Sequence, residues 1–251
     1  MSNTSVSPPL TSDEQSRIFV VIPVLNEENS IGLVLGDLPA VQQVVVVDNG
    51  STDSTADVAR QMGAKIVSEP KRGYGQACLT GIAQVNAETQ EKGLTASETI
   101  IVFIDGDYSD HPDELHELAR PILDDQADFV IGSRARGNRE TGAMPFQAMF
   151  GNWLACSLMR LFWGARFTDL GPFRAIRLSS LNDLDMADTN FGWTIEMQIK
   201  AIENKLRFLE IPVSYRKRIG VSKISGTVSG TIRAGYKILY TIFRQRLTTL
   251  F

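Results

Sequence analysis

The stretch Thr99-Ile100-Ile101-Val102-Phe103-Ile104-Asp105-Gly106-Asp107 decides how this chain is interpreted. Its first six residues are apolar or β-branched, which predicts a buried strand. Two carboxylates follow directly, at the end of a strand where open α/β sheets bind ligands. Residues two apart in an extended chain point to the same side, so Asp105 and Asp107 can face one ligand. Their oxygen atoms suit Mg²⁺ or Mn²⁺ bridged to a diphosphate.

An isolated Asp-x-Asp can also be an acidic turn that caps a helix, here the one expected near Pro112. Two earlier strands argue against that alternative, because each also ends in a polar, acidic loop. The strand at 18–22 leads into Pro23-Val24-Leu25-Asn26-Glu27-Glu28, and the strand at 43–48 leads into Asp48-Asn49-Gly50-Ser51-Thr52-Asp53. Strands that alternate with helical stretches predict right-handed βαβ units and a largely parallel sheet. All three loops then lie at one edge of that sheet.

The rest of the chain continues this α/β pattern. Helices are predicted over residues 27–38, 54–62, 75–85, 112–123, 144–163, 193–203 and 228–247. Further strands are predicted over residues 65–68, 128–132, 173–177 and 206–215. Residues 88–97 are interpreted as a polar insertion.

Composition predicts a soluble globular protein. The chain has 251 residues, of which 43% are hydrophobic and 22% charged, enough for one large α/β domain. A net charge of −4 argues against nucleic acid as a partner. Cys78 and Cys156 are expected to be free buried thiols. Residues 1–17 lack the apolar core of a signal peptide and are expected to form a flexible tail, and no run is apolar enough to span a bilayer.

These motifs together resemble glycosyltransferase family 2, and within it the polyprenyl-phosphate (dolichol-phosphate) mannose and glucose synthases. The matching stretches are Ile22-Pro23-Val24-Leu25-Asn26-Glu27-Glu28, Val47-Asp48-Asn49-Gly50-Ser51-Thr52-Asp53, Asp105-Gly106-Asp107, Gly132-Ser133-Arg134, Gly171-Pro172-Phe173-Arg174 and Gly220-Val221-Ser222-Lys223. The resemblance implies the GT-A nucleotide-diphospho-sugar transferase fold, an α/β fold with a mostly parallel central sheet flanked by helices. It implies a single domain over residues 18–251, with a nucleotide-sugar half (18–135) and an acceptor half that includes the C-terminal helix (136–251).

The activity implied by the resemblance is inverting, metal-dependent transfer of a hexose. The donor is a UDP- or GDP-sugar, the metal is Mg²⁺ or Mn²⁺, and the acceptor is a hydroxyl compound or a polyprenyl phosphate. The expected location is the cytoplasm, at the inner face of the membrane if the acceptor is a lipid.

The resemblance assigns the first two strand-end loops to the nucleotide. Pro23, Asn26 and Glu27 then contact the nucleotide, and Asp48 accepts hydrogen bonds from the base or the ribose. The same residues can instead form a turn, begin a helix or, for Asp48, cap the following helix. Many relatives carry a second aspartate where this chain has Asn49, whose amide forms hydrogen bonds but carries no charge.

Phosphate and metal contacts are expected in two further loops. Lys71 and Gly73 belong to a basic glycine-rich loop whose backbone can approach a ligand closely, and a solvated basic turn is the alternative. Asp107 is expected to ligate the metal. Asp105, with Gly106 beside it, is expected to contact the ribose, a metal-bound water or the metal. The metal would act as a Lewis acid on the leaving diphosphate.

Three cations are expected to meet phosphate groups. Arg134 can complement the charge of the leaving diphosphate, or it can form a surface ion pair. Arg218 and Lys223 belong to a basic segment that handles phosphates in the resembling synthases, and a solvated basic stretch is the alternative.

Glu196 matches, by its order along the chain, the family position that often supplies the general base. Asp169 is a rival for that role or a residue that structures its loop. An acceptor phosphate is already anionic and needs no base, in which case Glu196 would orient the sugar or the metal site.

Two other functions remain open from the sequence. A sugar-phosphate nucleotidyltransferase would need a glycine- and arginine-rich loop after its first strand, and this chain lacks one. A non-catalytic nucleotide-sugar-binding protein is favoured by Asn49 and opposed by Asp105, Asp107 and Glu196. The final helix, amphipathic from Val228 onward, is expected to make peripheral membrane contact or to form a homodimer interface.

Overall fold

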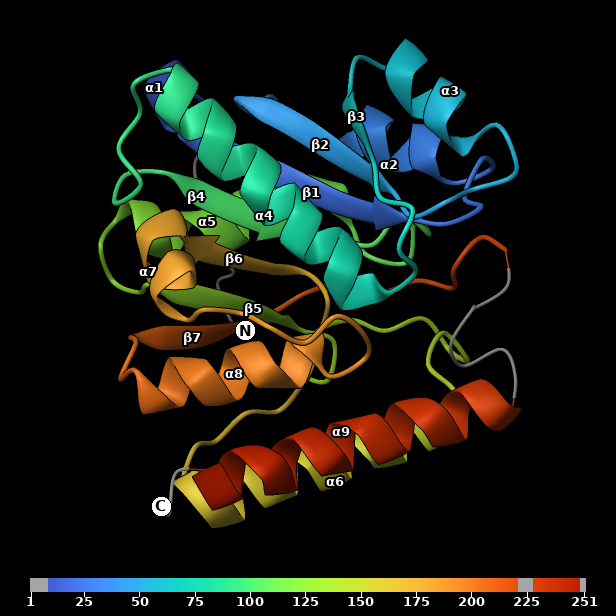
Figure 1. The fold of residues 1–251 in the computed structure, drawn as a ribbon, viewed down its shortest axis with the longest axis vertical. Coiled ribbons are helices and arrows are strands. Elements are labelled where there is room, and N and C mark those ends of the chain that lie inside the picture. The colour runs from blue at the N-terminus through green and yellow to red at the C-terminus, as the bar shows by residue number, and fades with distance from the viewer. Residues whose placement is uncertain (1–8, 221–227, 249–251) are drawn as a thin grey trace, which may run out of the picture.

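The computed structural model describes residues 9–220 and 228–248, which fold around one central sheet (Figure 1). The strands are β1 (Ile18–Val24), β2 (Gln43–Asp48), β3 (Lys65–Ser68), β4 (Ile100–Phe103), β5 (Phe129–Ser133), β6 (Arg174–Arg177) and β7 (Phe208–Pro212). Their order in the sheet is β3-β2-β1-β4-β6-β5-β7. Only β6 among these strands runs antiparallel to its neighbours, so the prediction of a mostly parallel sheet is confirmed.

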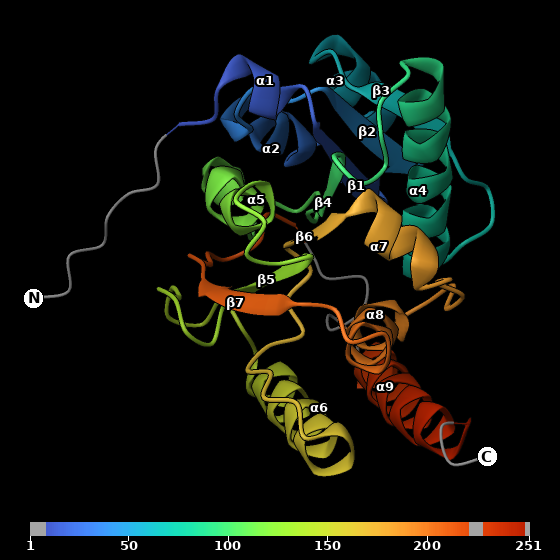
Figure 2. The same ribbon diagram turned by 90° about the vertical axis from the view of Figure 1, so that its left-hand side faces the viewer.

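Helices cover both faces of the sheet. They are α1 (Ser12–Gln15), α2 (Ile31–Asp37), α3 (Thr55–Gln61), α4 (Tyr74–Glu91), α5 (Leu115–Leu123, preceded by the 3₁₀ turn η1, Pro112–Glu114), α6 (Phe146–Trp163), α7 (Leu178–Asp183), α8 (Trp193–Glu203) and α9 (Val228–Thr248). Figure 2 shows α2 and α5 on one side of the sheet and α4 and α7 on the other. The result is a three-layer α/β/α arrangement.

The strands are apolar on both sides because each face of the sheet is covered. In β1, Phe19 and Val21 pack into the core beneath α4 and α8, while Val20 and Ile22 pack into the core beneath α2 and α5. All four side chains are fully buried. This two-sided burial explains why the strands appear in the sequence as continuous apolar runs instead of alternating patterns.

The strand order creates a crevice in the middle of the sheet. The chain runs outward from β1 through β2 to β3, then returns to place β4 on the other side of β1. The loops that follow β1 and β4 therefore diverge at their carboxyl ends, which is where open α/β sheets bind ligands. Strand β6 lies between β4 and β5, so residues from both predicted halves share the sheet.

The predicted flexible tail is wrong for residues 9–17. Thr11 and Glu14 form a capping box at the start of α1, and Leu10 is buried. Glu14 also pairs with Arg120 of α5, with 2.5 Å between Oε1 and Nη1. Hydrogen bonds from Arg120 and from the Thr11 backbone lower the pKa of Glu14 to about 2. The sequence pattern missed these contacts because Arg120 lies far along the chain.

Two helix boundaries also differ from those predicted. Helix α4 continues to Glu91, through the start of the expected polar insertion, because Glu88 is buried and pairs with Lys65 of β3. Helix α2 begins only at Ile31, since Glu28 is engaged with the α3 loop, where its carboxylate accepts a hydrogen bond from the Ser54 backbone.

Candidate active site

A cavity of about 310 Å³ lies at the carboxyl edge of the sheet, over the crevice between β1 and β4. Its walls come from the loops after β1, β2 and β4, from the start of α4 and from two segments of the second half. The lining residues are Pro23, Val24, Leu25, Glu27, Asn49, Arg72, Gly73, Tyr74, Ala77, Asp105, Gly106, Asp107, Asn190, Phe191 and Arg218. The sequence prediction that the three strand-end loops meet at one edge is confirmed.

Hydrogen bonds lock the β1 and β2 loops together beside this cavity. The side chain of Asn26 accepts a hydrogen bond from the Thr52 backbone at 2.8 Å. Asp48 accepts one from the Ser51 backbone at 2.9 Å. Asn26 and Asp48 are not among the cavity-lining residues, so in this arrangement they shape the loops that carry Pro23 and Glu27.

Asn49 holds the basic glycine-rich loop in place. Its side-chain nitrogen donates to the carbonyls of Glu69 and Lys71, at 2.9 and 2.8 Å, and its side-chain oxygen accepts from the Gly73 backbone at 2.8 Å. A carboxylate at this position could not donate these two bonds. The amide of Asn49 therefore matches the loop that it supports.

We expect Asn49→Asp to loosen that loop. Two partly buried carbonyl oxygens would lose their donors and face a negative charge, which costs about 1–3 kcal/mol in the free energy of unfolding. Thermal or urea unfolding of the variant measures this cost. Asp48→Asn, which keeps an acceptor oxygen for the Ser51 backbone, serves as the neighbouring control. Equal stability of Asn49→Asp and the parent chain would contradict the assignment.

The start of α4 packs tightly against the segment before α8. A Cβ atom on Gly75 would overlap the carbonyl oxygen of Asp188, and the Gln76 backbone donates to the carbonyl of Thr189 at 2.9 Å. This close approach brings Asn190 and Phe191 to the cavity wall. The sequence analysis missed both residues because nothing in their local pattern marks a segment docked on a distant helix.

Glu196 supports the same segment from behind. Its buried carboxylate accepts hydrogen bonds from the backbone of Ala187 at 3.2 Å and of Asp188 at 2.8 Å, and lies 3.1 Å from Nζ of Lys200. It is not among the cavity-lining residues. The prediction of Glu196 as a general base is therefore not supported by this geometry, since its oxygens are already engaged; the residue positions the cavity wall.

Asp105 and Asp107 both line the cavity, and Asp107 is buried whereas Asp105 is partly exposed. Oδ1 of Asp105 accepts a hydrogen bond from the Tyr74 hydroxyl at 3.1 Å. Oδ1 of Asp107 accepts a hydrogen bond from the Ser109 backbone. Its buried Oδ2 accepts no hydrogen bond, and its only described partner is the guanidinium of Arg218, with which it forms an ion pair. Burial raises the pKa of Asp105, an effect that Arg218 opposes.

Asp110 adds a further buried carboxyl group to this region, one that the sequence analysis did not single out. Neither of its oxygens has a hydrogen-bond partner. Burial and the nearby Asp105 raise its pKa to about 8. Asp105 and Asp107 therefore bring negative charge to the cavity wall, which favours a cation there, and Asp110 lies near Asp105 without lining the cavity.

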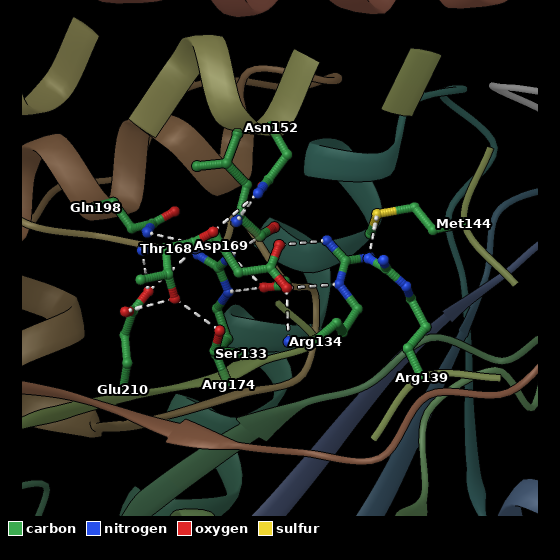
Figure 3. Close-up of polar contacts among 12 residues, drawn as sticks. Ser133, Arg134, Arg139, Met144, Asn152, Thr168, Asp169, Arg174, Gln198 and Glu210 are labelled. Atoms are coloured by element: carbon green, nitrogen blue, oxygen red, sulfur yellow. Dashed lines mark hydrogen bonds and ion pairs between the residues drawn. The ribbon is translucent and has the colours of Figure 1, made fainter. Parts of the chain in front are cut away.

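Arg134 and Asp169, which do not line this cavity, form a buried ion pair (Figure 3). The guanidinium donates through Nε at 2.8 Å and through Nη2 at 2.7 Å, one bond to each carboxylate oxygen, and the Arg134 backbone adds a third bond. Glu210 of β7 accepts hydrogen bonds from the backbone of Thr168 and Asp169. The charge of Arg134 is therefore taken up by Asp169, in contrast to the predicted role at a diphosphate, and Asp169 structures its loop.

The structure brings together eight of the residues predicted for the site, namely Pro23, Glu27, Asn49, Gly73, Asp105, Gly106, Asp107 and Arg218. Lys71 contributes a backbone carbonyl to the loop beside them. Lys223 lies outside the described residues. Within residues 9–220 and 228–248, no three His, Cys, Asp or Glu side chains cluster as metal ligands. In the same part of the chain, none of the helices combines the length and hydropathy needed to cross a bilayer.

A fold of this topology, with acidic and basic groups at its switch point, is typical of α/β proteins that bind nucleotides. Comparison with protein families gives the assignment: glycosyl transferase family 2 matches residues 19–185, and the chain belongs to that family. An uncharacterised glycosyltransferase of Mycobacterium tuberculosis is 36% identical over 220 residues, which cover 86% of this chain and 94% of the relative. The chain is thus a glycosyltransferase, which sets aside the nucleotidyltransferase and the non-catalytic binding protein.

Other relatives confirm the resemblance to the polyprenyl-phosphate branch. A dolichyl-phosphate hexose transferase of Haloferax volcanii is 30% identical over 235 residues, covering 92% of this chain and 96% of the relative. A polyprenol monophosphomannose synthase of Mycolicibacterium smegmatis is 28% identical over 258 residues, covering 95% and 92%.

Solved structures confirm the GT-A fold. Glucosyl-3-phosphoglycerate synthase from Mycobacterium tuberculosis, in complex with Mn²⁺, UDP-glucose and phosphoglyceric acid, superposes with a TM-score of 0.72. Its sequence identity is 22%, and the match covers 97% of this chain and 86% of that structure.

Proposed function

We propose that this glycosyltransferase moves a hexose, with inversion, from a UDP- or GDP-sugar to a polyprenyl phosphate in the presence of Mg²⁺ or Mn²⁺. An oxygen of the acceptor phosphate attacks the anomeric carbon. The bond from that carbon to the donor diphosphate breaks, and its electron pair leaves with the nucleoside diphosphate. The products are a polyprenyl phosphate hexose and UDP or GDP, formed at the inner face of the membrane.

The contacts that engage the two candidate bases, Glu196 and Asp169, favour a phosphate as the acceptor. Glu196 is held by two backbone N–H groups and Lys200, and Asp169 is held by Arg134. Neither side chain lines the donor cavity. A hydroxyl acceptor needs a positioned base, whereas a phosphate acceptor is a nucleophile without one. The names of the relatives, which include an undecaprenyl-phosphate mannosyltransferase of Micrococcus luteus, support the same acceptor class.

The residues at the end of β4 fit a divalent metal. Asp107 has a buried oxygen without a hydrogen bond, and Asp105 lines the same cavity. Mg²⁺ is commonly bound by one or two carboxylates together with substrate phosphates, so a larger ligand cluster is not required. When bound, the metal would stabilise the charge on the leaving diphosphate. Arg218 would pair with the same phosphates once its ion pair with Asp107 is broken.

Transfer assays with matched acceptors test this proposal. The full chain would be incubated with labelled UDP-glucose or GDP-mannose, Mn²⁺ or Mg²⁺, and either a polyprenyl phosphate or the unphosphorylated polyprenol in the same detergent. We expect organic-phase product from the phosphate acceptor alone, of inverted anomeric configuration, and none in excess chelator. Transfer to the polyprenol at the same rate would overturn the phosphate acceptor, and a product of retained configuration would overturn inversion.

A further inference from the structure

Tyr108, the residue directly after Asp107, has an unusual backbone conformation. Its φ angle is 62°, in the left-handed region that bulky side chains rarely adopt. Such a residue keeps this conformation only where its surroundings hold it, and residues of this kind cluster at functional sites. The contacts of Tyr108 therefore identify what fixes the loop that follows β4.

The turn at Tyr108 sets the direction of the Asp107 carboxylate. Oδ1 of Asp107 accepts its hydrogen bond from the Ser109 backbone at 2.9 Å. This bond joins the residues on either side of Tyr108, so it depends on the backbone conformation between them. Because Oδ1 is engaged in this way, Oδ2 is the oxygen left to face a cation, and its direction follows from the turn.

The side chain of Arg216 contacts this turn from the segment that follows β7. Its Nε donates to the Tyr108 carbonyl at 2.8 Å, and its Nη2 donates to the Asp110 carbonyl at 3.1 Å. The guanidinium also lies over the Tyr108 ring, with 3.4 Å between Cζ and the ring centroid. One planar group thus bonds to two carbonyls of the turn and covers its side chain. A lysine ammonium lacks the planar fork that this arrangement uses.

The end of α2 anchors the same ring. The Tyr108 hydroxyl donates to Oδ2 of Asp37 at 2.5 Å, and Nη2 of Arg216 lies 3.8 Å from that oxygen. Asp37 is the last residue of α2. Three parts of the chain that are far apart in the sequence therefore meet at this turn.

The backbone around Arg216 is also bonded to the loop after β4. The Arg216 N–H donates to the Ser109 carbonyl at 2.9 Å, and the Ile219 N–H donates to the Asp107 carbonyl at 3.0 Å. Arg218, between these two contacts, forms the ion pair with Oδ2 of Asp107. The segment that contacts the turn therefore also carries the arginine that we expect to meet the phosphates.

We propose that Arg216 is a positioning residue for the divalent metal: it holds the left-handed turn at Tyr108 and so directs Oδ2 of Asp107 into the donor cavity. The inference rests on the proposed function, which supplies the metal at Asp107. Arg216 is not among the cavity-lining residues, so it acts through the loop and not by touching the donor. Removal of a group that orients a metal ligand typically lowers metal affinity by about 10–100-fold.

Hydrogen–deuterium exchange of the full chain, without added metal, tests this contact independently of activity. We expect Arg216→Met to raise the exchange rate of backbone amides over residues 105–111 about tenfold or more, because the turn loses both donors. Lys217→Met is the matched control. It removes the same charge from the next residue, whose side chain is 59% exposed and pairs with Glu140, and it should exchange like the parent chain. Equal exchange in Arg216→Met and the parent chain would overturn the inference.

The Mn²⁺ dependence of sugar transfer distinguishes a positioning role from a general loss of stability. In Arg216→Met the Mn²⁺ concentration for half-maximal transfer should rise about tenfold or more, while kcat at saturating Mn²⁺ should fall less than about threefold. Arg216→Lys, which keeps the charge, should recover only part of this shift. An unchanged Mn²⁺ dependence in Arg216→Met, or full recovery in Arg216→Lys, would contradict the positioning role. A parent chain without Mn²⁺-dependent transfer would refute the proposed function itself, and the inference with it.

Discussion

Asp107→Asn is expected to lower the rate of sugar transfer by about a thousandfold or more while leaving the fold intact. The substitution keeps an oxygen that can accept the hydrogen bond from the Ser109 backbone, so the β4 loop retains its shape. It removes the negative charge of the buried oxygen that has no hydrogen bond of its own. That charge is what we propose to hold the divalent metal, whose stabilisation of the leaving diphosphate is worth several kcal/mol.

A measurement of donor binding should distinguish loss of a metal ligand at position 107 from a general loss of stability. The parent chain is expected to show Mn²⁺-dependent thermal stabilisation by its UDP- or GDP-sugar, and Asp107→Asn is expected to lose it. Asp113→Asn in η1 is the control, because its side chain is 66% exposed. A variant at position 107 that still binds donor in a metal-dependent manner, or turns over at the parent rate, would remove Asp107 as a metal ligand.

Much of the sheet and of the nucleotide side of the site could be predicted because the information is local. Each of β1, β2 and β4 is a short apolar run that ends in a polar loop, and parallel topology then fixes where those loops meet. Asp105 and Asp107 were predicted at this edge from their position at the end of a strand, and both line the cavity. The helix at 193–203 was also predicted with the bounds that α8 has.

The rest depends on contacts between residues far apart in the chain. Asn190 and Phe191 reach the cavity only because α4 begins with glycines that let its backbone touch Asp188 and Thr189. Glu196 stands at a position along the chain that is typical of a catalytic base, yet its carboxylate already accepts hydrogen bonds from two backbone N–H groups. A sequence motif shows which side chains are present, but it does not show which distant residues form hydrogen bonds with them.

The ion pair of Arg134 with Asp169 is another long-range contact that the sequence did not reveal, and its loss should cost the most stability. Both residues were predicted to take part in catalysis, and the structure joins them in an ion pair whose side chains are 13% and 1% exposed. Removing one partner of a buried pair leaves the other charge uncompensated. Asp169→Asn should therefore lower the free energy of unfolding by about 3–5 kcal/mol, measured by urea denaturation.

Replacing both partners tests whether the loss of stability comes from one uncompensated buried charge. The double variant Arg134→Met with Asp169→Leu removes both charges, so its stability should recover most of the loss seen in Asp169→Asn. Glu140→Gln is the control, since Glu140 pairs with Lys217 at the surface, where the side chains are 49% and 59% exposed, and should change stability by less than about 1 kcal/mol. A double variant as unstable as the single one would contradict the assignment.

Acid titration gives an independent check on the same pair. Burial alone would raise the pKa of Asp169, but the charge and hydrogen bonds of Arg134 outweigh it and lower the pKa. A carboxyl group whose pKa is lowered by folding stabilises the protein fully above its unfolded pKa of about 4 and loses that contribution as the pH falls further. The parent chain should therefore lose stability below about pH 4 more steeply than the double variant does. Parallel pH profiles would show that Asp169 is not held as a carboxylate by Arg134.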